Sequence, residues 1–214
     1  AMSTIDERGK QIITELEIRS AVDGDILRID EDAKLTPLAQ DLARERGIQI
    51  ERVRRRTSAN RKKIALGADH GGFEMKEEVK RVLADLGHDH QDFGTNSTEA
   101  VDYPDYAHHV ARAVARGSCD LGIVIDGAGI GSCMVANKVP GVRAAMCYDE
   151  ASARNSREHN GANVLTLGGK MISNDRMREI VRVWLATELT EDRHRRRVDK
   201  ISAVEREYLN SPSK

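Results

Sequence analysis

The sequence contains few of the residues that mark specialised protein classes. Its 214 residues include only three cysteines and four prolines, and 3% of them are aromatic. Cys119, Cys133 and Cys147 are odd in number and lack C-x-x-C spacing, which indicates neither a disulfide framework nor a zinc site. The polar start AMSTIDERGKQ does not resemble a secretory signal. Together these features predict a cytoplasmic protein without a metal.

The sequence also lacks long apolar runs and a strong excess of charge of either sign. No run approaches the roughly 20 apolar residues of a membrane-spanning helix. The net charge of −1 gives no general attraction to nucleic acid or to a membrane surface. We interpret the short basic stretch RVRRRTSANRKK, residues 52–63, as a solvated linker. The sequence therefore predicts no nucleic-acid partner and no membrane partner.

Residues 64–185 alternate short apolar segments with amphipathic helical patterns. The strand candidates are Ile64–Gly67, His90–Phe93, Leu121–Ile125, Val142–Cys147 and Val164–Leu167. Helical patterns lie between and after them, the first in GGFEMKEEVKRVLADLG. Strict alternation of strand and helix predicts an α/β fold, a doubly wound, Rossmann-like sheet of five parallel strands with helices on both faces.

The first 60 residues are predicted to form a small N-terminal extension, and residues 61–214 the main domain with a C-terminal helix. In KLTPLAQDLARERGIQI, Thr36 is a good N-cap, Pro37 suits the first turn and Gly47 suits the end, which predicts one short helix. DILRID and IQIERV are candidates for short strands. A final helix within 191–211 presents Val198, Ile201 and Val204 on one face.

The segment DGAGIGS, residues 126–132, follows the third predicted strand at the edge where such sheets bind ligands. It lacks both the P-loop pattern and the G-x-G-x-x-G spacing, which disfavours nucleotide binding. Successive backbone N–H groups at the start of a helix can still hold an anion. Asp126 has two interpretations, a helix N-cap or a general base. A base beside such N–H groups suits proton abstraction next to a carbonyl, because the groups can stabilise an enediolate.

Two further polar pairs are candidate functional groups. Asp69 and His70 follow the first strand, at the same edge of the sheet as Asp126. His159 and Asn160 lie in the loop before the fifth strand, where a lone histidine is usually an ordinary surface residue.

The segment EDRHRRRVDK surrounds His194 with arginines. Such a run is either a solvated charged face or a phosphate clamp, because the guanidinium fork matches phosphate oxygens. Arg193 and Arg197 are four residues apart and would share one face of a helix.

Taken together, these segments resemble the type B ribose-5-phosphate isomerase family, which also includes the galactose-6-phosphate isomerase subunits. The matching segments are KKIALGADHGGFEMKEEV, DFGT, DYPDYA, DGAGIGSCMVANKVPGVRAAMC, SREHNGANVLTLGGK and DRHRRRV, in the same order over about residues 62–208. The resemblance implies cofactor-free aldose–ketose isomerisation of a phosphosugar through an enediolate. It also implies a homodimer or homotetramer whose active sites are shared between subunits.

The resemblance assigns roles to individual residues. It implies that the substrate is bound by Asp69, His70, Tyr103, Gly127, Ala128, Gly129, Ile130, Gly131, Asn160, Lys170, Arg193, His194 and Arg197. His159 matches the histidine that opens the sugar ring, and the glycines of DGAGIGS match the loop that holds the developing oxyanion. Lys170 stands where family members often have arginine, so a point charge replaces a bidentate fork.

The sequence departs from the family at the catalytic base. Many members have cysteine at the position of Asp126 and serine or threonine at that of Ala128, and others use a glutamate at that of Ser132. We therefore predict that Asp126 is the base. Cys133 is one residue further along the helix than Ser132 and so points about 100° away from it, which predicts a small core residue. The alternative is a phosphosugar-binding protein that has lost catalysis and serves as a scaffold or cargo subunit.

The N-terminal extension does not match the family. Its segment LTPLAQDLARERGI is similar to a short motif of enzymes of bacterial microcompartments. This similarity implies shell or cargo proteins as partners of residues 1–60, and a location inside a microcompartment. The alternative is a small helical appendage that aids oligomerisation.

Overall fold

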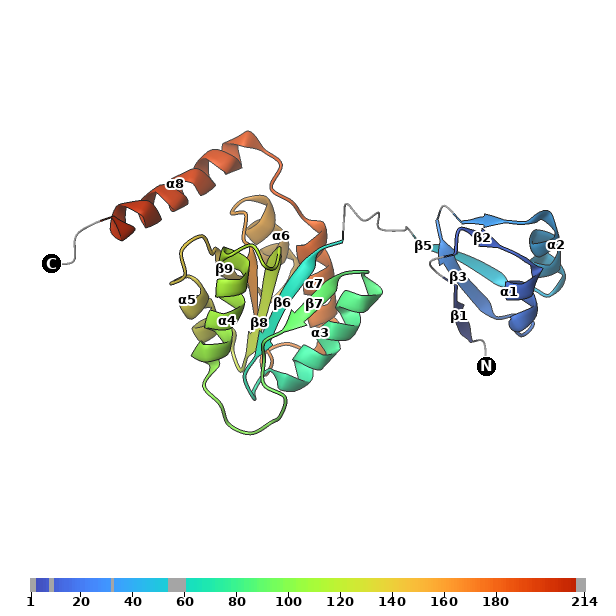
Figure 1. The fold of residues 1–214 in the computed structure, drawn as a ribbon, viewed down its shortest axis with the longest axis horizontal. Coiled ribbons are helices and arrows are strands. Elements are labelled where there is room, and N and C mark those ends of the chain that lie inside the picture. Colours follow the sequence, from blue (N-terminus) through green and yellow to red (C-terminus); the bar gives the residue numbers. More distant parts are fainter. Residues whose placement is uncertain (1–2, 8–9, 32, 54–60, 211–214) are drawn as a thin grey trace. The chain divides into compact units, whose positions relative to one another are not determined.

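The computed structural model describes residues 3–7, 10–31, 33–53 and 61–210, and the chain divides into two compact units, residues 1–60 and 61–214 (Figure 1). Most of the predicted basic linker, Arg54–Asn60, lies outside the described residues. Within the described ranges, no helix has both the length and the apolar character that crossing a bilayer requires.

The larger unit is built on one five-stranded sheet. Its strands are β6 (Lys63–Ala68), β7 (Asp89–Asp92), β8 (Leu121–Asp126), β9 (Ala144–Met146) and β10 (Val164–Gly168). They pair in the order β7-β6-β8-β10-β9, and every pairing is parallel. The predicted doubly wound parallel sheet is thus confirmed. The edge strand β9 is shorter than the predicted Val142–Cys147, and the N–H of Arg143, just before it, donates to the Asn163 side chain at 2.7 Å instead of to a strand.

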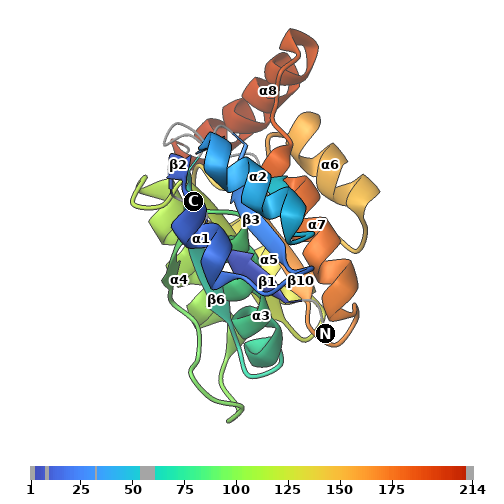
Figure 2. The ribbon, with the colours of Figure 1, turned by 90° about the vertical axis from the view of Figure 1, so that its right-hand side faces the viewer.

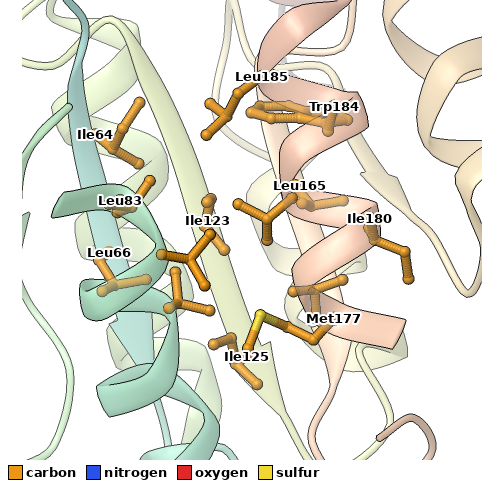
Figure 3. Close-up of a cluster of buried hydrophobic side chains, with 14 of the residues drawn as sticks. Ile64, Leu66, Leu83, Ile123, Ile125, Leu165, Met177, Ile180, Trp184 and Leu185 are labelled. Carbon is orange, nitrogen blue, oxygen red and sulfur yellow. The ribbon is translucent and has the colours of Figure 1, made fainter. Parts of the chain in front are cut away.

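Helices cover both faces of this sheet. The helices α3 (Phe73–Asp85), α6 (Glu150–Glu158) and α7 (Asn174–Ala186) lie on one face, and α4 (Tyr103–Ala115) and α5 (Ile130–Ala136) lie on the other. Figure 3 shows the first interface, where Leu66 and Ile123 of the sheet belong to one cluster with Leu83 of α3 and Trp184 of α7. Alternate strand residues such as Ala65 and Val124 face α4, as the two-residue period of a strand requires.

The last helix, α8 (Asp192–Leu209), follows α7 and is only partly packed on this unit. His194 and Val198 in its first half are buried. Further along, Ile201, Val204 and Tyr208 are 48%, 56% and 75% exposed, although their spacing places them on one face of the helix. This apolar face is therefore left uncovered by the chain itself.

The smaller unit has its own core and its own sheets. A parallel sheet has the order β1 (Thr4–Asp6), β3 (Ile26–Asp30), β5 (Gln49–Val53), and β2 (Ile12–Ile13) pairs with β4 (Lys34–Leu35). The expected helix is α2 (Pro37–Glu45), capped by Thr36, but a second helix, α1 (Glu15–Ser20), was not expected. Figure 2 shows both helices in front of β1 and β3. The apolar periodicity of α1 is weak, because Ile18 is its only buried residue, but Thr14 and Glu17 form a capping box that marks its start.

Candidate active site

Three loops meet at the carboxyl edge of the larger sheet. They follow β6 (Asp69–Gly72), β8 (Asp126–Gly129) and β10 (Gly168–Lys170). The N–H of Asp69 donates to the carbonyl of Ile125 at 3.2 Å, that of Gly169 to Asp126 at 2.7 Å, and that of Lys170 to Gly127 at 3.1 Å. The strand order reverses between β6 and β8, and ligands of such sheets bind at that reversal.

Glycines allow these loops to approach each other closely. A Cβ added at Gly169 would lie 2.7 Å from the carbonyl oxygen of Gly71. Gly129 has a φ of +81°, in the left-handed region, and a Cβ there would lie 2.9 Å from the carbonyl carbon of Leu167. Close packing between the loops is therefore one reason for a glycine in DGAGIGS, independent of any ligand.

The carboxylate of Asp126 is held by its own loop. Its Oδ1 accepts hydrogen bonds from the N–H of Ala128, at 2.8 Å, and from that of Gly129, and its Oδ2 accepts one from Ser132 at 2.9 Å. Only 5% of the residue is exposed. Two of the N–H groups expected to hold an enediolate thus donate to Asp126 instead. A carboxylate offers about four lone-pair sites, so about one remains for another proton.

Asp69 is the second carboxylate at this edge. Its Oδ1 accepts the N–H groups of Gly71 and Gly72 at 2.8 and 3.1 Å, and its Oδ2 makes no hydrogen bond among the described residues. Burial raises the pKa of Asp69, and the nearby Asp126 carboxylate adds to that rise against the opposing hydrogen bonds. A carboxyl group in this setting is suited to exchanging a proton with a ligand.

His70 and Lys170 line a cavity beside these loops. The His70 Nδ1 lies 3.2 Å from both the N–H and the carbonyl oxygen of Val101, which leaves Nε2 as the ring nitrogen available to a ligand. The cavity has a volume of about 480 Å³, and Thr98 and Asn174 also line it. The sequence analysis did not predict Thr98, in the loop after β7, or Asn174, the first residue of α7, because neither belongs to a motif with a known chemical role.

Tyr103 begins α4 and is 38% exposed, with its ring above the DGAGIGS loop. A Cβ added at Gly131 would lie 2.7 Å from the Tyr103 hydroxyl oxygen, so a larger residue there would displace the ring. The exposed Ile130 lies next to this contact. The structure thus places ten predicted residues at one edge: Asp69, His70, Tyr103, Asp126, Gly127, Ala128, Gly129, Ile130, Gly131 and Lys170.

The other five predicted residues lie at the opposite, amino edge of the same sheet: His159, Asn160, Arg193, His194 and Arg197. His159 is the C-cap of α6, at the start of the loop that leads to β10, and α8 begins beside it. The rings of His159 and His194 stack with centroids 4.2 Å apart. His194 is 2% exposed, and burial, together with the charge of His159, lowers its pKa. Arg193 bonds Glu191 at 2.5 Å.

The two groups are too far apart to act on one small molecule within one chain. They are separated by the length of β10, whose five residues span about 16 Å at roughly 3.3 Å per residue. The larger unit therefore carries the predicted site residues in two separate groups, one at each edge of its sheet.

Cys133 and Ser132 lie next to this site on α5, and Cys133 differs from its prediction as a core residue. The sulfur of Cys133 lies 3.4 Å from the carbonyl oxygen of Ala144 on β9, and Cys133 is half-buried rather than a core residue. Ser132 is fully buried, and its hydroxyl has no partner among the described residues. Over the same residues, no three His, Cys, Asp or Glu side chains gather as a metal site requires.

Comparisons with known proteins identify a family with the fold of the larger unit. Residues 64–201 match the family model described as Ribose/Galactose Isomerase. Ribose-5-phosphate isomerase B of Escherichia coli is 44% identical over 67% of this chain and 97% of its own length. D-erythrulose-4-phosphate isomerase of Pectobacterium atrosepticum is 38% identical over 66% of this chain and 94% of its own length. The solved ribose-5-phosphate isomerase B of Clostridium thermocellum matches 68% of this chain and 99% of its own at 49% identity, with a TM-score of 0.67.

Proposed function

We propose that this chain interconverts an aldose phosphate and its ketose phosphate through an enediolate. The chain belongs to the ribose/galactose isomerase family and is a sugar-phosphate isomerase. The substrate is ribose 5-phosphate with ribulose 5-phosphate, or a related sugar phosphate. The proposal rests on the carboxyl edge of the sheet, where glycines let three loops pack closely and bring Asp69, Asp126 and Lys170 together.

In this mechanism Asp126 transfers the proton between C1 and C2. The Ala128, Gly129 and Ser132 amides hold its carboxylate in place, and its remaining lone pair takes the substrate proton. The enediolate oxygen is stabilised by the backbone N–H groups of Gly127, Ile130 and Gly131, none of which donates to Asp126.

The phosphate end of the substrate is held by charge. His70 donates from Nε2, and Lys170 supplies an ammonium group at the same cavity. The arginines predicted to bind phosphate, Arg193 and Arg197, lie at the amino edge, so a second copy of the chain would bring them to the substrate.

We propose a homodimer in which each active site combines the carboxyl edge of one subunit with the amino edge of the other. The partner's His159 then opens the sugar ring, and the partner's Arg193 and the partner's Arg197 bind phosphate. Exposed apolar residues lie at both edges and support such an interface: Ile130, Met134, Tyr148 and Met171 at one edge, and Ile201, Val204 and Tyr208 on α8.

Incubation with aldose and ketose phosphates in deuterated water tests the reaction. NMR should show that the substrate isomerises and takes up deuterium at C2. Binding of a sugar phosphate without exchange or isomerisation would contradict the proposed chemistry and favour a binding role.

Mixing two inactive variants tests the shared site. Asp126→Asn damages the carboxyl edge and His159→Ala damages the amino edge. After subunit exchange, half of the dimers are mixed and each has one intact site, so about a quarter of wild-type activity should return. No recovery, with exchange confirmed by mass spectrometry, would place the complete site within one chain.

Residues 1–60 are proposed to serve targeting or assembly, with microcompartment shell or cargo proteins as partners. The separate core of this unit, formed around Ile18, Leu27 and Ile29, supports a role that does not depend on the isomerase domain.

A further inference from the structure

A lysine is completely buried beneath the edge that carries the proposed site. Lys76 on α3 is 0% exposed, although lysine is almost never fully buried unless it is paired. Its Nζ donates to Oδ2 of Asp92 at 2.6 Å and to the carbonyl oxygen of Thr95 at 2.7 Å. The Phe73 ring lies 5.5 Å from the same nitrogen. Both oxygen partners belong to the end of β7 and the loop that follows it.

This loop, residues 93–102, is fastened at its start. The N–H of Phe93 donates to Leu66 at 2.7 Å, and that of Thr95 donates to Ala68 at 2.9 Å, immediately before Asp69. A Cβ added at Gly94 would lie 2.6 Å from the N of Ala68 and 2.9 Å from Cδ of Lys76. The start of the loop is therefore tightly packed between the end of β6 and the Lys76 side chain.

The far end of the loop contacts His70. The N–H and the carbonyl oxygen of Val101 both lie 3.2 Å from His70 Nδ1, and Thr98 lines the same cavity as His70. When the Val101 N–H donates to Nδ1, the ring proton is on Nε2, which can then donate to an anion. Val101 thus engages Nδ1, through its N–H or its carbonyl oxygen, and leaves Nε2 to the ligand.

We propose that Lys76 is a positioning residue for substrate binding, which fixes the loop of residues 93–102 so that Val101 orients the imidazole of His70. An apolar side chain would fill the site at less desolvation cost, but it could not hold the Thr95 carbonyl. The inference rests on the proposed function, because it takes the phosphosugar as the ligand of His70.

The test compares Lys76→Met with Lys80→Met in the full-length chain. Lys80 is a matched control, since its Nζ also lies 2.6 Å from Oδ2 of Asp92 but makes no bond to the loop. Lys76→Met should raise KM about tenfold with kcat changed less than about threefold, as expected for lost ground-state and transition-state binding. Lys80→Met should leave KM within about twofold of wild type.

Two measurements separate positioning from a loss of stability. In a His70→Ala background, Lys76→Met should raise KM no further, because the two residues act in one chain of contacts. The ¹⁵N chemical shifts of His70 should show that Nε2 is protonated in the wild type and that the tautomer population is mixed in Lys76→Met. Unchanged shifts, or effects on KM that add in the double variant, would overturn the proposal.

A second variant covers the case in which Lys76→Met does not fold. Gly94→Ala displaces the same loop while Lys76 remains, so it should give the same rise in KM and the same change at His70. If the wild type isomerises no sugar phosphate, the proposed function fails. The His70 ¹⁵N shifts then still decide whether Lys76 positions the ring.

Discussion

Replacing Asp126 with asparagine changes both the hydrogen bonds that its carboxylate accepts and its proposed role as the base. The side chain keeps its shape, but one carboxylate oxygen becomes an NH₂ group. In the orientation that keeps the bonds from Ala128 and Gly129, the NH₂ faces the N–H of Ser132, and that N–H loses its acceptor. The variant also removes the charge and the lone pair that would take the substrate proton.

The expected size of each effect follows from these contacts. A buried donor left without a partner costs about 1–3 kcal/mol, so the free energy of unfolding should fall by about that amount. Loss of a general base should lower kcat by about 100-fold or more, while KM for the sugar phosphate changes less than about threefold. At a temperature where the variant is fully folded, partial unfolding cannot explain a roughly 100-fold fall in kcat.

The assay is steady-state kinetics at such a temperature, together with urea unfolding followed by circular dichroism. Asp25→Asn is a matched control: Asp25 is also buried and accepts N–H groups on both oxygens, from Ser3 and Val22, but it lies in the smaller unit. It should alter unfolding without altering kcat. Unchanged turnover in Asp126→Asn would refute the base assignment and make Cys133 a candidate again.

Three further predictions concern other parts of the chain. Lys170→Ala should raise KM for the sugar phosphate about tenfold with little change in kcat, and steady-state kinetics would show a smaller effect for Lys170→Arg if charge is what matters. Deleting residues 1–60 should leave kcat and KM within about twofold, because the two units have separate cores. Bonds from the Thr14 side chain, Lys10 and the Thr14 backbone lower the pKa of Glu17 from 4.5 to about 2. The smaller unit should therefore lose stability as pH falls from 4.5 to about 2, and NMR-detected unfolding should show less acid sensitivity in Glu17→Gln.

The sheet of the larger unit could be predicted because its three central strands, β6, β8 and β10, are almost wholly buried and three of its helices are long and amphipathic. The 13-residue helices α3, α4 and α7 each repeat apolar residues at helical spacing. Helix α1 has six residues and a single buried side chain, and β2 and β4 have two residues each. Elements that short depend on tertiary contacts, which periodicity does not show.

The motifs predicted candidate site residues, the strand order placed Asp69 and His70 at the edge of Asp126, and the family resemblance implied sites shared between subunits. The prediction did not place His159 and the arginines at the opposite edge of the sheet. Strand direction could have placed His159 at the amino edge, yet it lies within the same family signature as Asn163 and Lys170. Asp126 accepts hydrogen bonds from the Ala128 and Gly129 amides because the backbone turns sharply, with a φ of +81° at Gly129. A glycine allows such a φ, but its presence in the sequence does not show that the chain adopts it. The bond between Lys76 and Thr95 joins residues whose proximity only the fold reveals.

The placement of functional side chains at two opposite edges has a consequence for how activity develops in time. On the proposed arrangement, a newly folded chain carries every reactive group and catalyses nothing until it meets a second copy. Specific activity should then fall on dilution, with a midpoint at the dimer dissociation constant. Synthesis and folding would set the amount of protein, whereas pairing would set the moment at which isomerisation begins.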